Sequence, residues 1–220
     1  MKAHVSTAFS DILFKDCANI ISIDVPSLTD STSGYTISAK AKGARIFQDS
    51  NNQHHFTLIP SKNDVTIKLG IKGQGDHVKS SLRKLKFKAI IPPPPRIILI
   101  VNGKEHDGLS PISRGSRLVI KVLPDKLFCS QMPHDSDYAL NRIELLAQHS
   151  LGQPSRSAVF SGAGHDAGEG IKISLKRLGT AEPGTKIYLR IDRLFRINFE
   201  NQLIPVDLDQ NALIIDAVIK

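Results

Sequence analysis

The sequence predicts an all-β protein made of two β-sandwich-like, immunoglobulin-like domains joined by a polyproline linker. Strand-like segments in which apolar and polar residues alternate recur along the whole chain, and in its first half no helical periodicity lies between them. Turn-forming Gly, Asn, Asp, Ser and Pro residues fill the gaps. Four consecutive prolines, Pro92–Pro95, interrupt the pattern. Proline fixes φ and cannot donate to a sheet, so this run ends a strand and forms a stiff, extended spacer.

The first domain is expected over residues 1–91. In its clearest strand, Val65–Lys72, four apolar residues alternate with Thr66, Lys68, Gly70 and Lys72. The other strand-like segments are Ile20–Val25, Tyr35–Ala39, His54–Ile59 and Leu85–Ile91. Around the last of these, Lys84, Lys86 and Lys88 alternate with apolar residues, so they are expected on the exposed face of a half-buried strand.

The linker is expected at residues 92–96 and the second domain at 97–220. An Asn-Gly pair at 102–103 predicts a tight hairpin turn after the first strand. The strand-like segments are Ile97–Val101, Arg117–Leu123, Ile171–Leu175, Lys186–Asp192, Phe195–Phe199 and Leu213–Ile219. Residues 141–147 fit either a strand or a helical turn. Residues 150–170 are rich in Gly and Ser around one short apolar island, which predicts a long loop.

The segment 186–200 carries several charges and one break in its alternation. Ile187, Leu189 and Ile191 share one phase, whereas Leu194 falls on the opposite one. This slip predicts a bulge or turn near residues 192–193. Arg190 and Arg196 are expected to point outwards, on a solvated face or on an interface with a charged partner.

The chain is basic, and the charge is uneven. Its formal net charge is +8, and residues 1–93 contribute +6 of it, with 13 Lys and Arg against 7 Asp and no Glu. A basic surface suits an acidic partner, nucleic acid or an anionic surface. Single-strand binders usually add stacking aromatic residues, and this chain has no Trp and only 3 Tyr, so nucleic acid is not expected. No apolar run reaches the roughly 20 residues of a membrane helix, and no signal peptide is visible.

No catalytic, cofactor or metal site is predicted, so an enzyme is disfavoured. Cys17 and Cys129 are far apart in sequence and are expected to be free and buried. Three His-Asp pairs, at 106–107, 134–135 and 165–166, lie in turn-rich segments where Asp bonds the local backbone. The glycine run at 161–170 matches neither phosphate-binding glycine motif. A triad assembled from distant residues stays open.

Three segments resemble the two C-terminal periplasmic domains of the GldM/PorM family, motor subunits of gliding motility and type IX secretion in Bacteroidetes-type bacteria. They are the opening CANIISIDVPSL at 17–28, the proline crossing FKAIIPPPP at 87–95, and the closing PGTKIYLRIDRLFRINFENQLIPV at 183–206. A strand at 35–37 adds to the likeness. The family's membrane helix and first two periplasmic domains have no counterpart here, so we expect a segment of such a protein or a shorter relative.

The resemblance implies a non-enzymatic, dimeric periplasmic scaffold or shaft that binds other cell-envelope proteins of the same complex. It implies no cofactor and no membrane contact by this segment itself. Basic residues on exposed faces, Lys84, Lys86, Lys88, Arg190 and Arg196, are the candidates for partner binding. The alternative is an extracellular adhesin or glycan-binding Ig-like module with its function in the loops. The scarcity of Trp and Tyr, which provide stacking surfaces for sugars, argues against that alternative.

Overall fold

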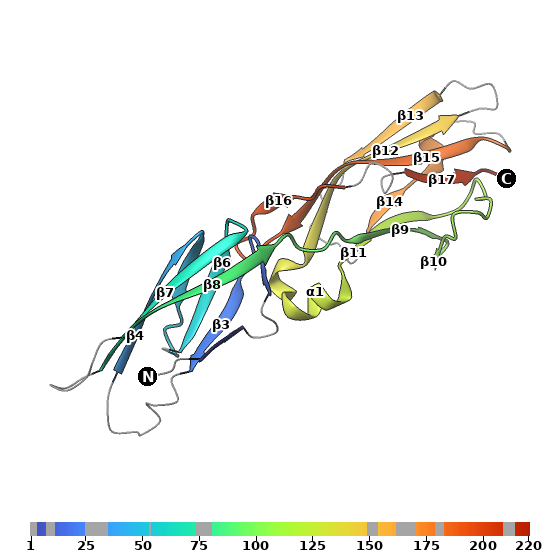
Figure 1. Cartoon of the computed structure of the whole chain (residues 1–220). Coiled ribbons are helices and arrows are strands. Elements are labelled where there is room, and N and C mark those ends of the chain that lie inside the picture. The colour runs from blue at the N-terminus through green and yellow to red at the C-terminus, as the bar shows by residue number, and fades with distance from the viewer. Residues whose placement is uncertain are drawn as a thin grey trace. The chain divides into compact units, whose positions relative to one another are not determined.

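The computed structural model describes residues 4–7, 12–24, 35–52, 54–73, 81–148, 154–161, 170–178, 183–208 and 214–220. The chain divides into two compact units, Met1–Pro92 and Pro93–Lys220, with the boundary inside the proline run. The prolines lie in an irregular segment, residues 91–95, between the last strand of the first unit and the first strand of the second (Figure 1).

The described residues of the first unit form two four-stranded sheets. One sheet has the order β1-β3-β6-β5 and the other the order β2-β8-β7-β4. All neighbours are antiparallel except β2 and β8, which pair in parallel. The strands are β1 (His4–Thr7), β2 (Ile12–Phe14), β3 (Asn19–Asp24), β4 (Tyr35–Lys42), β5 (Ala44–Gln48), β6 (His55–Pro60), β7 (Asp64–Gly73) and β8 (Ser81–Ile90).

One apolar core lies between these two sheets. Ile21 and Leu58 enter it from the first sheet, and Ile67, Leu69 and Ala89 from the second. Apolar and polar residues alternate along β7 because one face of this strand is buried in the core and the other is exposed, as the sequence predicted. Two sheets that share a core in this way make a β-sandwich.

The strand order of this sandwich is that of an immunoglobulin constant-type domain. Such domains place their first, second, fifth and fourth strands in one sheet and their third, sixth and seventh in the other. If β1 and β2 are counted as two halves of a first strand that changes sheets, β1-β3-β6-β5 and β4-β7-β8 reproduce that order. Asn19, which is 2% exposed, supports the change of sheet. Its amide accepts from Phe14 N–H at 2.7 Å and donates to Phe14 and Leu58 carbonyls at 2.8 and 3.2 Å, which ties β2 to β6.

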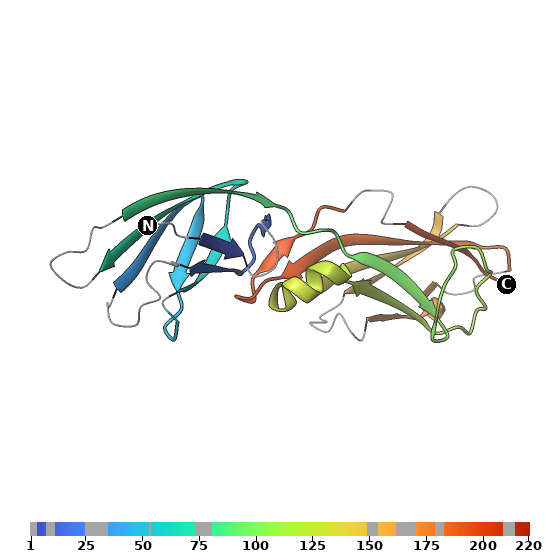
Figure 2. The same ribbon diagram turned by 60° about the horizontal axis from the view of Figure 1, so that its bottom comes forward.

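The second unit is also a two-sheet sandwich. Its described sheets are β10-β9-β11-β14 and β13-β12-β15, in which β16 and β17 both pair with β15 (Figures 1 and 2). Their core contains Leu99 and Ile120 from the first sheet and Ile143, Leu145 and Leu189 from the second. The strands are β9 (Arg96–Val101), β10 (Lys104–Glu105), β11 (Leu118–Leu123), β12 (Asp137–Gln148), β13 (Pro154–Ser161), β14 (Ile171–Ile173), β15 (Lys186–Ile197), β16 (Leu203–Pro205) and β17 (Ile214–Val218).

The fold class predicted from the sequence is confirmed, because both units are β-sandwiches and the first has the strand order of an Ig domain. The predicted Asn-Gly turn joins β9 to β10, and Asn102 and Gly103 both have positive φ, +51° and +86°. Residues 141–147, which fitted either structure, belong to β12. The two segments expected at 186–192 and 195–199 are one strand, β15, interrupted by a change of register.

Three local expectations are wrong. No strand is expected in the gap between Tyr35–Ala39 and His54–Ile59, yet residues 44–48 form β5, because Gly43 at φ +86° lets the chain change sheets directly after β4. Part of the expected loop at 150–170 is the strand β13, which pairs with β12; residues 150–153 and 162–169 lie outside the described part. A helix, α1 (Lys126–Gln131), follows β11 because Asp125 caps it, its carboxylate accepting from Phe128 N–H at 2.9 Å. Short 3-10 turns span Pro133–Asp135 and Leu175–Leu178.

Candidate functional site

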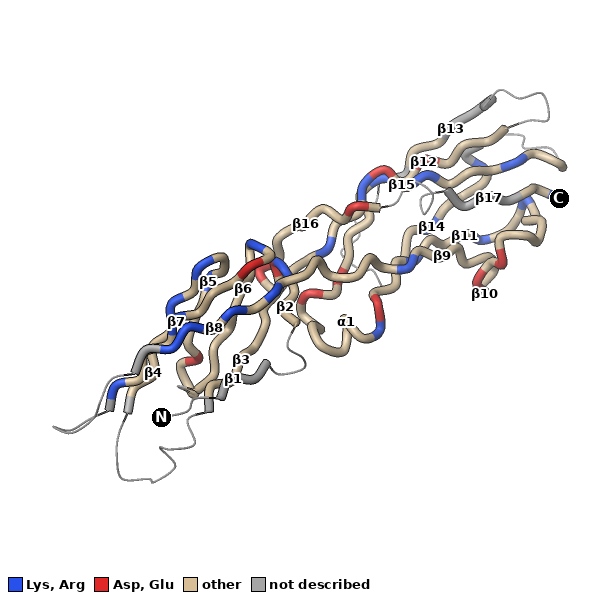
Figure 3. The backbone as a smooth tube through the Cα atoms, viewed as in Figure 1, with Lys and Arg blue, Asp and Glu red and all other residues tan. Residues whose placement is uncertain are grey.

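The outer face of the sheet β2-β8-β7-β4 carries a cluster of exposed lysines. Alternation places them there, because their neighbours along each strand, such as Ile67, Leu69 and Ala89, enter the core. Figure 3 shows the blue Lys and Arg segments along β7 and β8. We call the following six exposed residues the lysine face: Lys40, Lys42, Lys68, Lys72, Lys84 and Lys86.

The strand register places three of these lysines directly opposite one another. Lys68 on the middle strand β7 is paired with Lys40 on β4 and with Lys84 on β8. In the next row, Thr66 separates Lys42 from Lys86. Like charges directly opposite on neighbouring strands destabilise a sheet. The row Lys40–Lys68–Lys84 therefore lowers the stability of the fold.

Little negative charge offsets this face. Within β4, β7 and β8 the one acidic residue is Asp64, at the start of β7. It forms an ion pair with Lys88, its register partner, and both side chains are more than three-quarters exposed. Short hydroxyl side chains lie between the lysines on this face, and one of them, Ser38, donates to the Gly70 carbonyl at 3.3 Å. The result is a polar surface with a concentrated positive charge, which attracts anions and acidic protein surfaces.

The candidate residues Lys84, Lys86 and Lys88 are all exposed on this one face, as expected. Lys88 differs from the other two because Asp64 neutralises it. The sequence indicated Lys68 and Lys72 as the exposed side of a strand, but it did not indicate that β4, β7 and β8 are neighbours. The alternation of Lys40 and Lys42 with alanines in SAKAK was the local signal for the third strand.

The two arginine candidates of the second unit have different environments. Arg190 is exposed as expected and forms an ion pair with Glu144, its register partner on β12. The expectation that Arg196 points outwards is wrong, since Arg196 is 3% exposed. Its guanidinium lies 3.6 Å from the Asp135 carboxylate, donates to the Asp135 carbonyl at 3.1 Å, and stands 6.0 Å from the centre of the Phe128 ring. Arg196 is therefore a structural residue of the sandwich.

The predicted bulge explains the inward position of Arg196. The pairing of β12 with β15 changes register around Arg142, so that Leu140 faces Leu194 while Ile143 faces Ile191. One phase change moves every later side chain of β15 to the opposite face. Leu194 and Arg196 both become buried, while Arg190 keeps the exposed phase that it has before the bulge. The sequence revealed the break in alternation near residues 192–193. The prediction that Arg196 points outwards, however, extended the alternation of the residues before the break past it.

The remaining polar candidates have local structural partners. Asp107 accepts from the backbone and the side chain of Ser110, both at 2.7 Å, and from Leu109 N–H at 2.9 Å. The bonds from Ser110 lower the pKa of this carboxyl well below its usual range. The neighbouring His106 donates from Nε2 to the Ser110 carbonyl at 2.7 Å and accepts Gly108 N–H at Nδ1. This His-Asp pair organises a turn.

The other His-Asp pairs and the cysteines give no site. Asp135 pairs with Arg196 while His134 is exposed, and residues 165–166 lie outside the described part of the chain. Cys17 and Cys129 form no disulfide with each other; Cys17 is buried as expected, but Cys129 is half-buried. Within the described residues, no group of three His, Cys, Asp or Glu side chains could hold a metal ion. Nor do the described residues contain a helix long and apolar enough to cross a membrane.

Comparison with known proteins does not identify a family. No family model matches the sequence, and no curated protein matches it. Among solved structures, the chain is similar to the chicken interferon gamma receptor alpha chain, with 11% sequence identity over 93% of this chain and 92% of that one. The TM-score of that match is 0.27, so the Ig-like assignment rests on the strand order given above.

Proposed function

We propose that this chain is a non-enzymatic protein-binding module of the bacterial cell envelope, which docks an acidic partner on its lysine face. The observation that carries the proposal is the row Lys40–Lys68–Lys84. A row of opposed like charges costs stability, and the sheet carries almost no compensating carboxylate. Acidic groups of a partner would relieve the repulsion between these lysines, which favours binding. They would also speed association through long-range attraction.

The setting of the module is inferred from the sequence resemblance. A periplasmic scaffold or shaft of a gliding-motility or type IX secretion complex would bind other envelope proteins of that complex, and it would act as a homodimer. Both units are Ig-like sandwiches, a fold that is widely used to present binding surfaces. The proline run supports a shaft, because a stiff junction transmits displacement that a Gly/Ser linker would absorb.

The test is capture of partners from a cell-envelope extract, with the captured proteins identified by cross-linking and mass spectrometry. The variant replaces Lys40, Lys68 and Lys84 by Glu. A matched control makes the same charge change at three exposed lysines elsewhere, Lys62, Lys104 and Lys126. We expect the lysine-face variant to lose capture of motility or secretion components severalfold, and wild-type capture to weaken with salt.

Two results would count against the proposal. Equal capture by wild type, the lysine-face variant and the control variant would mean that another surface binds the partner. Retention of the wild type on carboxylated or sulfated glycans, without protein partners, would favour the adhesin or glycan-binding alternative.

A further inference from the structure

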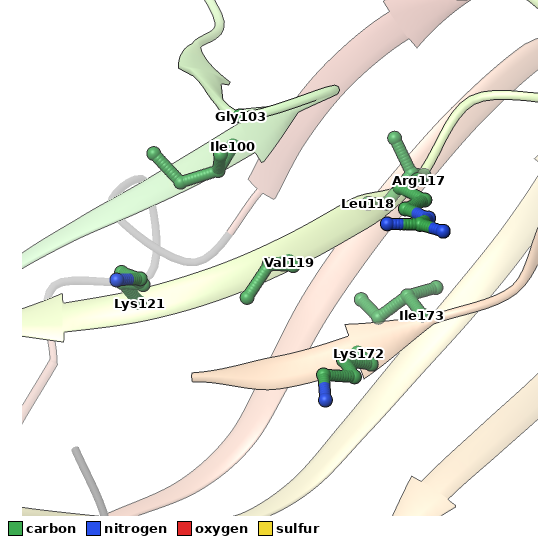
Figure 4. A pocket seen from close by; sticks show the side chains of 8 residues that line it. All are labelled: Ile100, Gly103, Arg117, Leu118, Val119, Lys121, Lys172 and Ile173. Atoms are coloured by element: carbon green, nitrogen blue, oxygen red, sulfur yellow. The ribbon is translucent and has the colours of Figure 1, made fainter. Parts of the chain in front are cut away.

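A second basic surface lies on the second unit, on the outer face of the sheet β10-β9-β11-β14. This face holds an open pocket of about 750 Å³, within the size range of ligand-binding clefts. Val119 and Lys121 line it from β11, Arg117 from the position just before β11, Ile100 from β9 and Lys172 from β14 (Figure 4). The pocket therefore has apolar side chains between cationic ones.

The strand geometry fixes the order of these groups. Leu118 and Ile120 of β11 are buried in the core, so the residues that alternate with them face outwards. The register pairs Val119 with Ile100 on one side and with Lys172 on the other. The apolar centre at Val119 is thus flanked by Lys121 on β11 and by Arg117 just before β11, each two residues away, and Lys172 lies beside it on β14.

The described residues around this pocket do not neutralise its positive charge. None of the described residues that line the pocket is acidic. By contrast, Arg96 of the same unit forms an ion pair with Glu105, and Arg190 forms one with Glu144. Among the described residues, no ion pair involves Arg117, Lys121 or Lys172.

We propose that this pocket binds an extended peptide segment of a partner protein with the pattern acid–x–apolar–x–acid. Residues four apart on a strand are separated by about 13 Å, so the ends of such a segment match the separation of Arg117 and Lys121. Its central apolar side chain then covers Val119 and Ile100, and Lys172 adds a further attraction. A small inorganic anion would leave the apolar centre in contact with water. A nucleic acid would find no aromatic ring to stack on among the described residues that line the pocket.

The first experiment tests the spacing of the acids. A fluorescein-labelled peptide containing Glu-Thr-Leu-Thr-Glu is titrated with the full chain and followed by fluorescence anisotropy. A control peptide of the same composition carries its two Glu residues next to each other. We expect the spaced peptide to bind about threefold to tenfold more tightly at about 0.15 M salt. Equal affinities would overturn the proposal, as would an absence of saturation below roughly 1 mM.

The second experiment tests the residues. We expect Lys121→Gln and Lys172→Gln each to weaken binding by about threefold, as loss of an exposed charge pair does, and the double variant by about tenfold. Val119→Glu places a carboxylate between the cations and should abolish binding. Lys186→Gln, an exposed lysine on β15 in the other sheet, is the matched control and should bind as the wild type does. Unchanged binding by the double variant would overturn the proposal.

The inference does not depend on the lysine face, and the two can fail separately. Lys68→Glu changes the other unit and should leave peptide binding unaltered, whereas Lys121→Gln should leave docking by the lysine face unaltered. Displacement of the peptide by a single-stranded oligonucleotide at a lower concentration than by unlabelled peptide would overturn the peptide proposal in favour of a nucleic-acid site. Thermal melting of each variant verifies that it is folded.

Discussion

Lys68→Glu should make the protein more stable while weakening its docking to an acidic partner. Lys68 is the centre of the row Lys40–Lys68–Lys84, with one lysine directly opposite on each side. The substitution removes two repulsions and creates two attractions. Lysine and glutamate are both unfavourable in strands to a similar degree, so the intrinsic strand preference contributes little to the difference.

The size of the effect follows from the register. Paired Cβ atoms lie about 5 Å apart, and the long side chains spread their charges to about 8 Å. In water, two unit charges at that separation interact by about 0.5 kcal/mol. Salt screening reduces this to about 0.2 kcal/mol at 0.15 M and to about 0.4 kcal/mol at 0.01 M. Four such changes give a stabilisation of about 0.8 kcal/mol in physiological salt and about 1.6 kcal/mol in low salt.

The assay is urea unfolding at the two salt concentrations, with the free energy taken from the midpoint and slope. Lys68→Gln removes the repulsions without adding attractions, so it should give about half of the stabilisation. Lys62→Glu, at an exposed turn residue of the same unit, makes the same change in net charge outside the row. If Lys68→Glu stabilises no more than Lys62→Glu, or if its effect does not shrink with salt, the reasoning from the row is wrong.

Three further results are expected. Asn19→Ala should destabilise the first unit by about 2 to 4 kcal/mol, measured by urea unfolding, because the buried backbone groups that it bonds lose their partner; a loss below about 0.5 kcal/mol would contradict this account. Arg196→Ala should destabilise the second unit by about 3 to 5 kcal/mol because it leaves Asp135 as a buried, uncompensated charge. An unchanged urea midpoint would show that the Arg196–Asp135 pair contributes nothing to stability. Replacing Pro92–Pro95 by Gly-Ser repeats should broaden the distance distribution from small-angle X-ray scattering without changing the melting of either unit; an unchanged distribution would show that something other than the prolines fixes the geometry.

Local patterns in the sequence predicted the strands well where one face of a strand is buried. The segment at 65–72 alternates cleanly and corresponds to β7. β5 was missed because Gly43 and its neighbours read as a turn, although this glycine lets the chain change sheets between two strands. The helix α1 was missed because six residues are too few for a periodicity, and its signal is the single capping residue Asp125.

Arg196 shows why a charged residue in a strand cannot be assigned to the surface from its phase alone. Its phase is set by the bulge near Arg142, and the sequence locates a bulge only to within a residue or two. Its burial further requires a partner, and Asp135 comes from a 3-10 turn far away in the sequence. A buried arginine is tolerated because this one carboxylate compensates its charge, and the pairing of two distant residues leaves no local pattern.

The same reasoning explains why both basic surfaces were only partly visible in the sequence. Alternation indicates which side chains of one strand face outwards, and it did so for Lys68, Lys84 and Lys86. The density of charge depends on register, which places Lys40, Lys68 and Lys84 in one row and Lys172 beside Val119. Register is set by pairing between segments as far apart as β11 and β14. Electrostatic attraction grows with the number of charges within a Debye length, so the neighbours across strands decide which lysines act together.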